Sequence, residues 1–141
     1  MIGFSPESSL ENILVTDLMT KSVISVDSST TAHDAAKLME ESEISSVVVF
    51  ENNLPVGMIT DRDFAIKITA HAYPIDTPVR RIMSTPLITI TSDSLFRVGA
   101  DLMNSRKIKR LVVVDDEKVV GIITIRDLVN HFIRNVKNES H

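Results

Sequence analysis

Two matched hydroxyl and carboxylate pairs are the residues of this sequence that could bind a polar ligand. Thr60 and Asp63 close one Gly-x-Ile-Thr-x-Arg-Asp stretch, and Thr124 and Asp127 close a second stretch of the same pattern later in the chain. In each stretch an apolar, β-like run precedes the threonine, and a helix-like segment begins near the aspartate. Carboxylates accept hydrogen bonds, and threonine hydroxyls donate and accept them. The pattern predicts a ligand site; the structural alternative is a helix cap, because Thr and Asp also satisfy free amides at helix N-termini.

Composition narrows the class of protein. The 141 residues include no cysteine, which excludes disulfides, thiolate metal ligands and a cysteine nucleophile. The four histidines lack metal-ligand spacing, and we find no nucleophile elbow or phosphate-binding glycine loop, so we expect neither a metal site nor catalysis. No apolar run reaches the roughly 18 residues of a membrane span, and no signal segment is recognisable. We therefore expect a cytoplasmic protein that does not enter the membrane.

Charge is distributed unevenly along the chain. Residues 1–75 carry four Lys/Arg and eleven Asp/Glu, whereas residues 76–141 carry eleven and eight. The net charge of −4 argues against general nucleic-acid binding, which depends on neutralising phosphates. A basic strip at residues 106–110 keeps a nucleic-acid-associated protein open as an alternative.

The chain contains one unit twice. A constant shift that places Val15 on Val79 gives 16 identities over the 50 positions from Val15 to Phe64 without a gap. Two units are too few for a stacked solenoid, so we expect a closed pair. We divide the chain into an N-terminal extension with a short helix, repeat 1, a linker with two prolines, repeat 2 and a tail, at residues 1–14, 15–72, 73–78, 79–137 and 138–141.

Each repeat has the pattern of a strand, a helix, a hairpin and a second helix. Residues 23–26 are β-rich, and strand-like runs at 47–50 and 56–60 flank Asn52-Asn53, which predicts an antiparallel hairpin. Helical spacing places apolar residues on one face of the first helix of each repeat. These residues are Ala32, Ala35, Ala36 and Met39 in repeat 1, and Leu95, Val98, Gly99, Leu102 and Met103 in repeat 2. A helix through Phe64, Ile66 and Ile68 closes repeat 1.

The doubled pattern resembles a tandem pair of cystathionine-β-synthase (CBS) domains, also called a Bateman module. The resemblance covers residues 12–136 and rests on Val-x-x-Leu-Met-Thr at 15–20, Val-x-x-Ile-Met-Ser at 79–84, the hairpins and the two Thr-x-Arg-Asp endings. It implies an α/β (α+β) fold of two β-α-β-β-α repeats packed with pseudo-twofold symmetry and two clefts. It also implies frequent assembly into a homodimer of pairs, whose head-to-head or head-to-tail arrangement stays open.

Proteins of this family commonly bind adenosine-containing ligands in these clefts. The resemblance implies AMP, ADP or ATP, with S-adenosylmethionine and NADH as alternatives, and no required cofactor. An aspartate there can accept hydrogen bonds from both ribose hydroxyls, and the strand segment of the opposite repeat completes each cleft. The implied set for the first cleft is Thr20, Ser22, Val23, Ile24, Lys109, Arg110, Thr124, Arg126 and Asp127. The implied set for the second is Ser45, Ser46, Thr60, Arg62, Asp63, Ser84, Pro86, Leu87 and Ile88.

Two differences between the repeats favour the Asp127 cleft for phosphates. Lys109-Arg110 stands where repeat 1 has Ser45-Ser46, so only one cleft has fixed positive charge. Asp61 stands where repeat 2 has Ile125, and like charges about 4 Å apart cost about 4 kcal/mol at an effective dielectric of about 20. We predict Asp127 as the principal ligand carboxylate.

The sequence therefore predicts a non-enzymatic regulatory module that binds an adenine nucleotide and acts on an unidentified partner protein. Three alternatives stay open. They are a structural dimerisation or protein-interaction module with no ligand, a nucleic-acid-associated protein, and a small hydrolase acting on the bound nucleotide.

Overall fold

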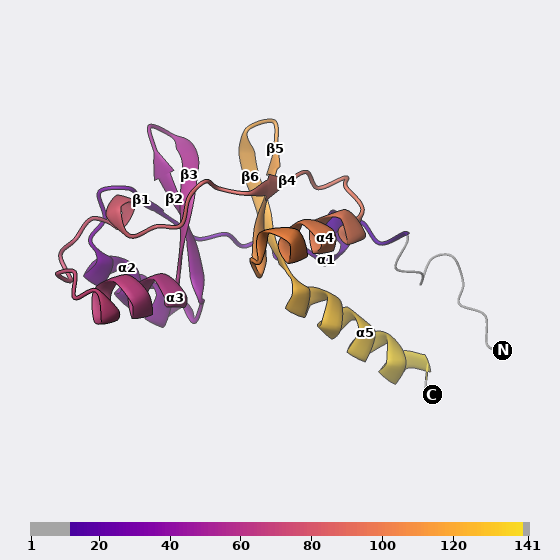
Figure 1. The fold of residues 1–141 in the computed structure, drawn as a ribbon. Helices are drawn as coiled ribbons and strands as arrows, with labels where there is room; N and C mark the ends of the chain where they lie inside the picture. Colours follow the sequence, from indigo (N-terminus) through magenta and orange to yellow (C-terminus); the bar gives the residue numbers. More distant parts are fainter. Residues whose placement is uncertain (1–11, 140–141) are drawn as a thin grey trace. The chain divides into compact units, whose positions relative to one another are not determined.

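The computed structural model describes residues 12–139 and confirms the α+β fold (Figure 1). The chain forms two compact units that do not follow the repeat boundaries. Among the described residues, unit 1 contains residues 12–22 and 89–139, and unit 2 contains residues 23–88. The helix expected at residues 1–14 lies largely outside the described residues. The segment with the Met-Thr motif of repeat 1 therefore belongs to the same unit as the hairpin of repeat 2.

Unit 2 is a three-stranded sheet with helical segments around it. The sheet has the order β1-β2-β3, with β1 parallel to β2 and β2 antiparallel to β3. Its strands are β1 (Ser25–Asp27), β2 (Ser46–Glu51) and β3 (Leu54–Thr60). Its helical segments are α2 (Ala32–Ser42), α3 (Asp61–Asp63), a π-helical segment (Phe64–Ala70) and a 3-10 turn (Val79–Arg81).

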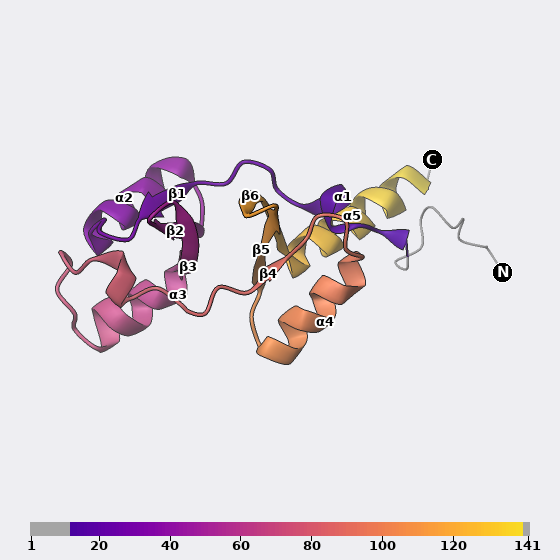
Figure 2. The ribbon, with the colours of Figure 1, turned by 90° about the horizontal axis from the view of Figure 1, so that it is seen from above.

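Unit 1 has the same sheet topology, β4-β5-β6, with a parallel and then an antiparallel pair. Its strands are β4 (Thr89–Ile90), β5 (Arg110–Asp115) and β6 (Lys118–Thr124), and its helices are α1 (Val15–Leu18), α4 (Phe96–Arg106) and α5 (Ile125–Glu139). Figure 1 and Figure 2 both show α5 continuing from β6 and extending away from the sheet. The side chains at the start of α5 therefore lie at the end of a sheet strand.

The predicted hairpin is present in both units with the same turn geometry. Asn52 and Asn53 have φ of 51° and 64°, and Asp116 and Glu117 have φ of 50° and 65°. Two successive residues with positive φ form the turn that matches the twist of paired strands, and asparagine tolerates this conformation well. The internal repeat of the sequence thus extends to the backbone angles of the turns.

Two residues predicted on the buried faces of the helices are exposed in the structure. In α2 the residues Ala32, Ala35 and Met39 are buried, but Ala36 is exposed. In α4 the buried residues are Phe96, Gly99 and Met103, whereas Val98 is 47% exposed. Both errors concern residues at the margin of the apolar stripe, where one step of about 100° around the helix turns a side chain from the sheet to solvent.

Two other local predictions need correction. The first strand begins at Ser25, so residues 23 and 24 precede it. The closing helix of repeat 1 is π-helical from Phe64 to Ala70 rather than α-helical. The spacing of Phe64, Ile66 and Ile68 does not have the period of an α-helix face.

A short extra pairing is added to the edge of each sheet. In unit 1, Thr20 exchanges two backbone hydrogen bonds with Ile122 of β6, with N···O distances of 2.9 and 3.0 Å. In unit 2, Ser84 exchanges the equivalent bonds with Met58 of β3, at 2.8 and 3.3 Å. The internal repeat relates the two contacts to each other. Each sheet edge is thus paired with the Met-Thr or Met-Ser segment that the other repeat supplies.

The turn before α4 gives a prediction about acid stability. Ser92 donates to Asp115 from its hydroxyl (2.5 Å) and its amide (3.0 Å), and these bonds lower the pKa of Asp115 below the usual 3.8. A carboxyl with a lowered pKa stabilises the fold above about pH 4, and this contribution disappears as the pH falls through the lowered value.

Ser92→Ala is therefore expected to raise the pKa of Asp115 toward its usual value, measured by carboxyl NMR titration. The stability difference between wild type and variant should shrink below about pH 4. Ser28→Ala, which removes the bond to Glu51 at the equivalent position of unit 2, is the control. An unchanged Asp115 titration in Ser92→Ala would contradict this assignment.

Candidate functional site

Asp127 is held by a reciprocal cap at the start of α5. The Thr124 amide donates to Asp127 Oδ2 at 2.8 Å, and the Asp127 amide donates to Thr124 Oγ1 at 3.1 Å. Such a cap satisfies two helix N-terminal amides and fixes the carboxylate direction. Within the part of the chain that the structure describes, no hydrogen bond reaches Asp127 Oδ1. The cap and a ligand role are therefore compatible, because one oxygen holds the helix start and the other is open to a donor.

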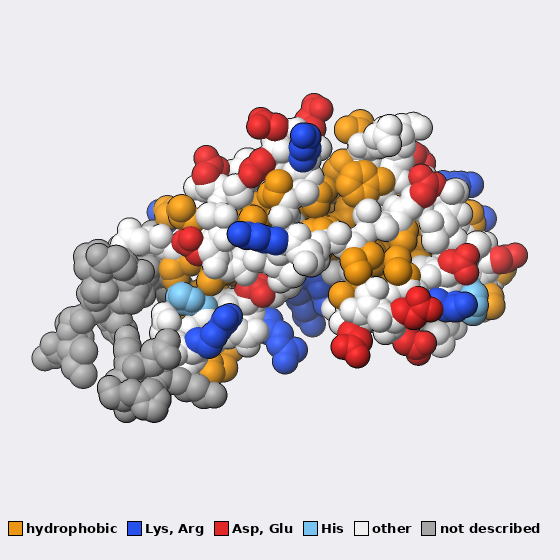
Figure 3. Space-filling model, turned by 180° about the vertical axis from the view of Figure 1, so that it is seen from behind, with side chains coloured by type: hydrophobic (Ala, Val, Ile, Leu, Met, Phe, Trp, Pro, Cys, Tyr) orange, Lys and Arg blue, Asp and Glu red, His pale blue; other side chains and the backbone are white. Residues whose placement is uncertain are grey.

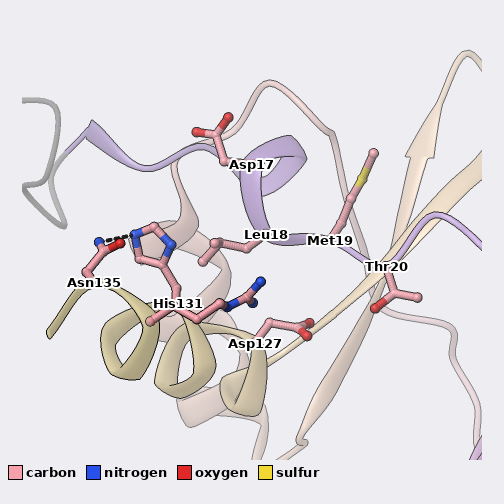
Figure 4. Close-up of a pocket in the computed structure, with 8 residues that line it drawn as sticks. Asp17, Leu18, Met19, Thr20, Asp127, His131 and Asn135 are labelled. Atoms are coloured by element: carbon pink, nitrogen blue, oxygen red, sulfur yellow. Dashed lines mark hydrogen bonds between the residues drawn. The ribbon is translucent and has the colours of Figure 1, made fainter. Parts of the chain in front are cut away.

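A pocket of about 470 Å³ lies in front of this carboxylate (Figure 4). Its lining comes from two segments of unit 1, the loop around α1 and the first turns of α5. The loop contributes Asp17, Leu18, Met19 and Thr20, and α5 contributes Asp127, His131, Arg134 and Asn135. The volume is within the range of roughly 300–1,000 Å³ that small-molecule sites occupy.

The pocket residues of α5 share one helix face. Positions 131, 134 and 135 follow Asp127 at i+4, i+7 and i+8, the spacing that stacks side chains along a helix. Figure 4 shows His131 and Asp127 on the side of α5 that faces the segment around α1, with Asn135 bonded to the imidazole. The His131 Nε2 and Asn135 Nδ2 atoms are 3.0 Å apart. The sequence analysis gave His131 no chemistry, although counting forward from Asp127 would have found this face.

Charge in the pocket is mixed. Asp17 and Asp127 supply two carboxylates, Arg134 a permanent cation, and His131 a group that can donate or accept. Leu18 and Met19 add apolar surface. Such a lining can bind a ligand that combines hydroxyl donors with an anionic group.

Thr20 reaches the pocket because of its pairing with β6, which requires a glycine opposite. Gly121 has negative φ, so the need is for space and not for conformation. A Cβ at this position would lie 2.7 Å from Met19 Sδ and 3.0 Å from the Thr20 carbonyl oxygen. Gly57 has the same relation to Met83 and Ser84. Each glycine allows the Met-Thr or Met-Ser segment to lie directly on the sheet.

The other residues predicted for the Asp127 cleft do not line this pocket. Ser22, Lys109 and Arg126 are exposed. Arg110 begins β5, where it is paired with Thr124. Val23 and Ile24 belong to unit 2. Of the predicted set, the structure brings together Thr20, Thr124 and Asp127.

The Asp63 position of unit 2 has the same cap but a different environment. Asp63 is 6% exposed, and its Oδ2 accepts from the Thr60 amide at 2.9 Å and the Thr60 hydroxyl at 3.3 Å. Its Oδ1 accepts from Ser84 Oγ at 2.9 Å and from Lys67 Nζ at 3.2 Å. The sequence analysis placed Ser84 in this set and missed Lys67.

The remaining residues predicted for the second cleft are spread around unit 2. Ser46 pairs with Thr60 at the start of β2, and Ser45 accepts from the Asp61 amide through its carbonyl. Arg62 is exposed, as is Pro86, which follows a cis peptide bond. Leu87 and Ile88 are half-buried.

The two structural units divide the charged residues differently from the two halves of the sequence. Among the described residues, unit 1 contains ten Lys/Arg and eight Asp/Glu, and unit 2 contains five and nine. Figure 3 shows acidic side chains over both units. The described part of unit 1 therefore has a net charge of only +2, which is small for a nucleic-acid-binding surface and weakens the nucleic-acid alternative.

Metal and membrane signatures were sought throughout residues 12–139. No cluster of three or more His, Asp or Glu side chains able to hold a metal ion is found among these described residues. Across the same part of the chain, no helix combines the length and apolar character that crossing a bilayer requires.

The doubled sheet topology, the swapped edge segments and the paired Thr-x-Arg-Asp caps define a tandem-repeat module. The family model for the CBS domain matches residues 15–69 and 79–134, so the chain belongs to the CBS domain family.

Several known proteins share most of this chain's length. The CBS domain-containing protein YhcV of Bacillus subtilis is 35% identical over 126 residues, which covers 89% of this chain and 88% of YhcV. The uncharacterised protein MJ1232 of Methanocaldococcus jannaschii is 37% identical over 123 residues, but these span 86% of this chain and only 40% of that protein. The crystal structure of an uncharacterised conserved protein from Pyrococcus horikoshii matches with a TM-score of 0.80 and 30% identity, covering 86% of this chain and 92% of that one.

Proposed function

We propose that this chain is a non-enzymatic sensor that binds an adenosine-containing ligand in the Asp127 pocket and modulates a partner protein. AMP, ADP or ATP is the first choice, and S-adenosylmethionine and NADH are the alternatives. The observation that carries the proposal is the capped Asp127 with Oδ1 free of hydrogen bonds from the described residues, facing a pocket of about 470 Å³. The lack of cysteine is consistent with a cytoplasmic setting.

The pocket chemistry matches the parts of a nucleotide. The open oxygen of Asp127 can accept from ribose hydroxyls, and a hydrogen bond to a charged group contributes about 1.5–3 kcal/mol. Arg134, further along α5, can pair with a phosphate, and a neutral or protonated His131 can donate to it. The side chains of Leu18 and Met19 offer apolar surface for a base. The two carboxylates make a ligand without hydroxyl or amino donors a poor fit.

A thermal-shift panel tests the proposal. AMP, ADP, ATP, S-adenosylmethionine and NADH are each added to the whole chain, and a ligand present at about 100 times its Kd should add about 2.7 kcal/mol to the unfolding free energy. Turnover of bound nucleotide is measured in parallel, and we expect none. If no ligand in the panel raises Tm, the proposal fails. Turnover would instead favour the hydrolase alternative.

A dimer is the second proposal, and it rests on the outer face of α5. The apolar side chains exposed on this helix are Ile125, Val129, Phe132, Ile133 and Val136, each more than 40% exposed. Their i, i+4, i+7, i+8 and i+11 spacing puts them on one stripe, opposite the face that lines the pocket. Burying apolar surface contributes about 25 cal/mol per Å², and a second copy offers the same stripe. One helix would then link the ligand pocket to the subunit contact.

Ile133→Asp is expected to turn the dimer into a monomer, because it places a charge in the centre of the stripe. Analytical ultracentrifugation should find wild type at twice 15.7 kDa and the variant at 15.7 kDa. Asn130→Asp, on the polar side of the same helix, is the matched control and should leave the mass unchanged. A monomeric wild type, or equal masses for both variants, would contradict the dimer.

A further inference from the structure

Lys67 occupies the position in unit 2 where a ligand would contact Asp63. Its ammonium lies 3.2 Å from Asp63 Oδ1 and 2.6 Å from the Ile82 carbonyl oxygen. The first contact is an i, i+4 ion pair, and the second ties the π-helical segment to Ile82, which caps the 3-10 turn Val79–Arg81 two residues before Ser84. Lys67 thus bridges the two sides of the site from within the chain.

The Asp63 carboxylate has little acceptor capacity left. Four donors reach it, the amide and hydroxyl of Thr60 on Oδ2 and the Ser84 hydroxyl with the Lys67 ammonium on Oδ1. Two carboxylate oxygens offer about four lone-pair sites, so all of them are in use. A ribose would have to displace Lys67 or Ser84 before it could bind here.

In unit 1, no side chain of the described residues occupies the corresponding position beside Asp127 Oδ1. His131 aligns with Lys67 in the internal repeat, and it stands at the same i+4 position relative to Asp127. Its ring nitrogen pairs with Asn135, and in the described residues no bond joins it to Asp127. The burial of the two aspartates fits this difference, because Asp63 is buried whereas Asp127 is only half-buried.

We propose that Lys67 acts as an internal occupant that closes the Asp63 position, so that each chain binds a single nucleotide, at Asp127. This inference rests on the proposed function, since it assumes that Asp127 binds the ligand. The difference between the two sites then comes from one residue pair, Lys67 and His131, and not from Lys109-Arg110. The occupancy of the two sites is then set by which side chain stands at i+4 from each aspartate.

Isothermal titration with AMP tests the proposal on the whole chain. Wild type should bind one AMP per chain, and Lys67→Ala should bind two, because the freed Asp63 oxygen can accept from ribose. Lys67→Arg retains the cation and should still bind one. Thermal unfolding of each variant checks that it is folded. We expect only a small change in Tm, because 28% of the lysine side chain is accessible and solvent weakens the ion pair.

The outcomes separate this proposal from the proposed function. If wild type and Lys67→Ala each bind one AMP per chain, the Lys67 proposal is overturned and the proposed function stands. The same holds if wild type binds two AMP per chain. No binding in wild type with one AMP in Lys67→Ala overturns the Asp127 site and supports Lys67 as the occupant. No AMP binding in either overturns the Lys67 proposal and AMP as the ligand, while the five-ligand panel decides the proposed function.

A converse exchange gives a second test. His131→Lys should place an ammonium beside Asp127 and weaken AMP binding at least tenfold relative to His131→Gln, which removes the imidazole without adding a cation. Tighter binding by His131→Lys than by His131→Gln would overturn the proposal, because the lysine would then be serving phosphate rather than excluding ribose.

Discussion

Asp127→Ala is expected to lower the affinity for AMP at least a hundredfold. Two hydrogen bonds from ribose hydroxyls to a charged oxygen contribute at least about 1.5 kcal/mol each, and every 1.4 kcal/mol or so is about a factor of ten in Kd. In the proposed complex the acceptor for both is Asp127 Oδ1, because Oδ2 accepts from the Thr124 amide. Isothermal titration of wild type and variant measures the loss.

The control for Asp127→Ala is Asp63→Ala, which removes the same helix cap from unit 2. Both variants lose a cap that contributes about 0.5–2 kcal/mol of stability, so each is titrated at a temperature where it is fully folded. Asp127→Asn is added because its amide oxygen can still accept from the Thr124 amide while the charge is gone. Wild-type affinity in Asp127→Ala, or an equal loss in Asp63→Ala, would contradict the assignment.

Gly121→Val is expected to damage both the fold of unit 1 and the pocket. The new side chain collides with Met19 and with the Thr20 carbonyl oxygen, which would be 3.0 Å from its Cβ. The methionine end can move, but the carbonyl accepts the Ile122 amide at 3.0 Å and cannot shift without breaking the pairing. Overpacking of this kind costs about 1–3 kcal/mol. Because Met19 and Thr20 line the pocket, AMP affinity should also fall tenfold or more.

Gly57→Val provides the matched comparison for Gly121→Val. Its Cβ would meet Met83 Sδ at 2.7 Å and the Ser84 carbonyl at 3.0 Å, the same distances as in unit 1. Thermal unfolding should show a similar loss of stability in the two variants, and titration should show a loss of affinity in Gly121→Val alone. An equal loss of affinity in both would mean that binding responds to general destabilisation and not to the wall of the pocket.

The internal repeat predicted much of the fold because apolar runs and turns depend on local sequence. It located both hairpins, the Asn52-Asn53 turn and the two capped aspartates. It failed where tertiary context decides, as at Ala36 and Val98, which lie at the margins of their apolar stripes and are exposed. The spacing of Phe64, Ile66 and Ile68 does not fit an α-helix face, but it does not by itself predict the π-helical turn after Asp63.

The site was less predictable than the fold, because it joins residues that lie far apart in the sequence. Thr20 and Ser84 were assigned through the family resemblance, and the structure puts each beside the sheet of the other repeat. To predict His131 and Arg134 as pocket residues, one would have to know that the Asp127 face of α5 lies across the pocket from the α1 segment. The role of Lys67 depends on the Ile82 carbonyl, a backbone atom whose position no side-chain pattern encodes.

The central claim is that an adenine nucleotide binds at Asp127, and backbone amide NMR titrations of the wild-type chain with AMP, ADP and ATP test it most directly. Binding at Asp127 predicts saturable shifts centred on the amides of Thr20, Asp127 and His131, with the amides of Thr60 and Ser84 unaffected. Shifts centred on Thr60 and Ser84, or no shifts with any of the three nucleotides at millimolar concentration, would contradict it.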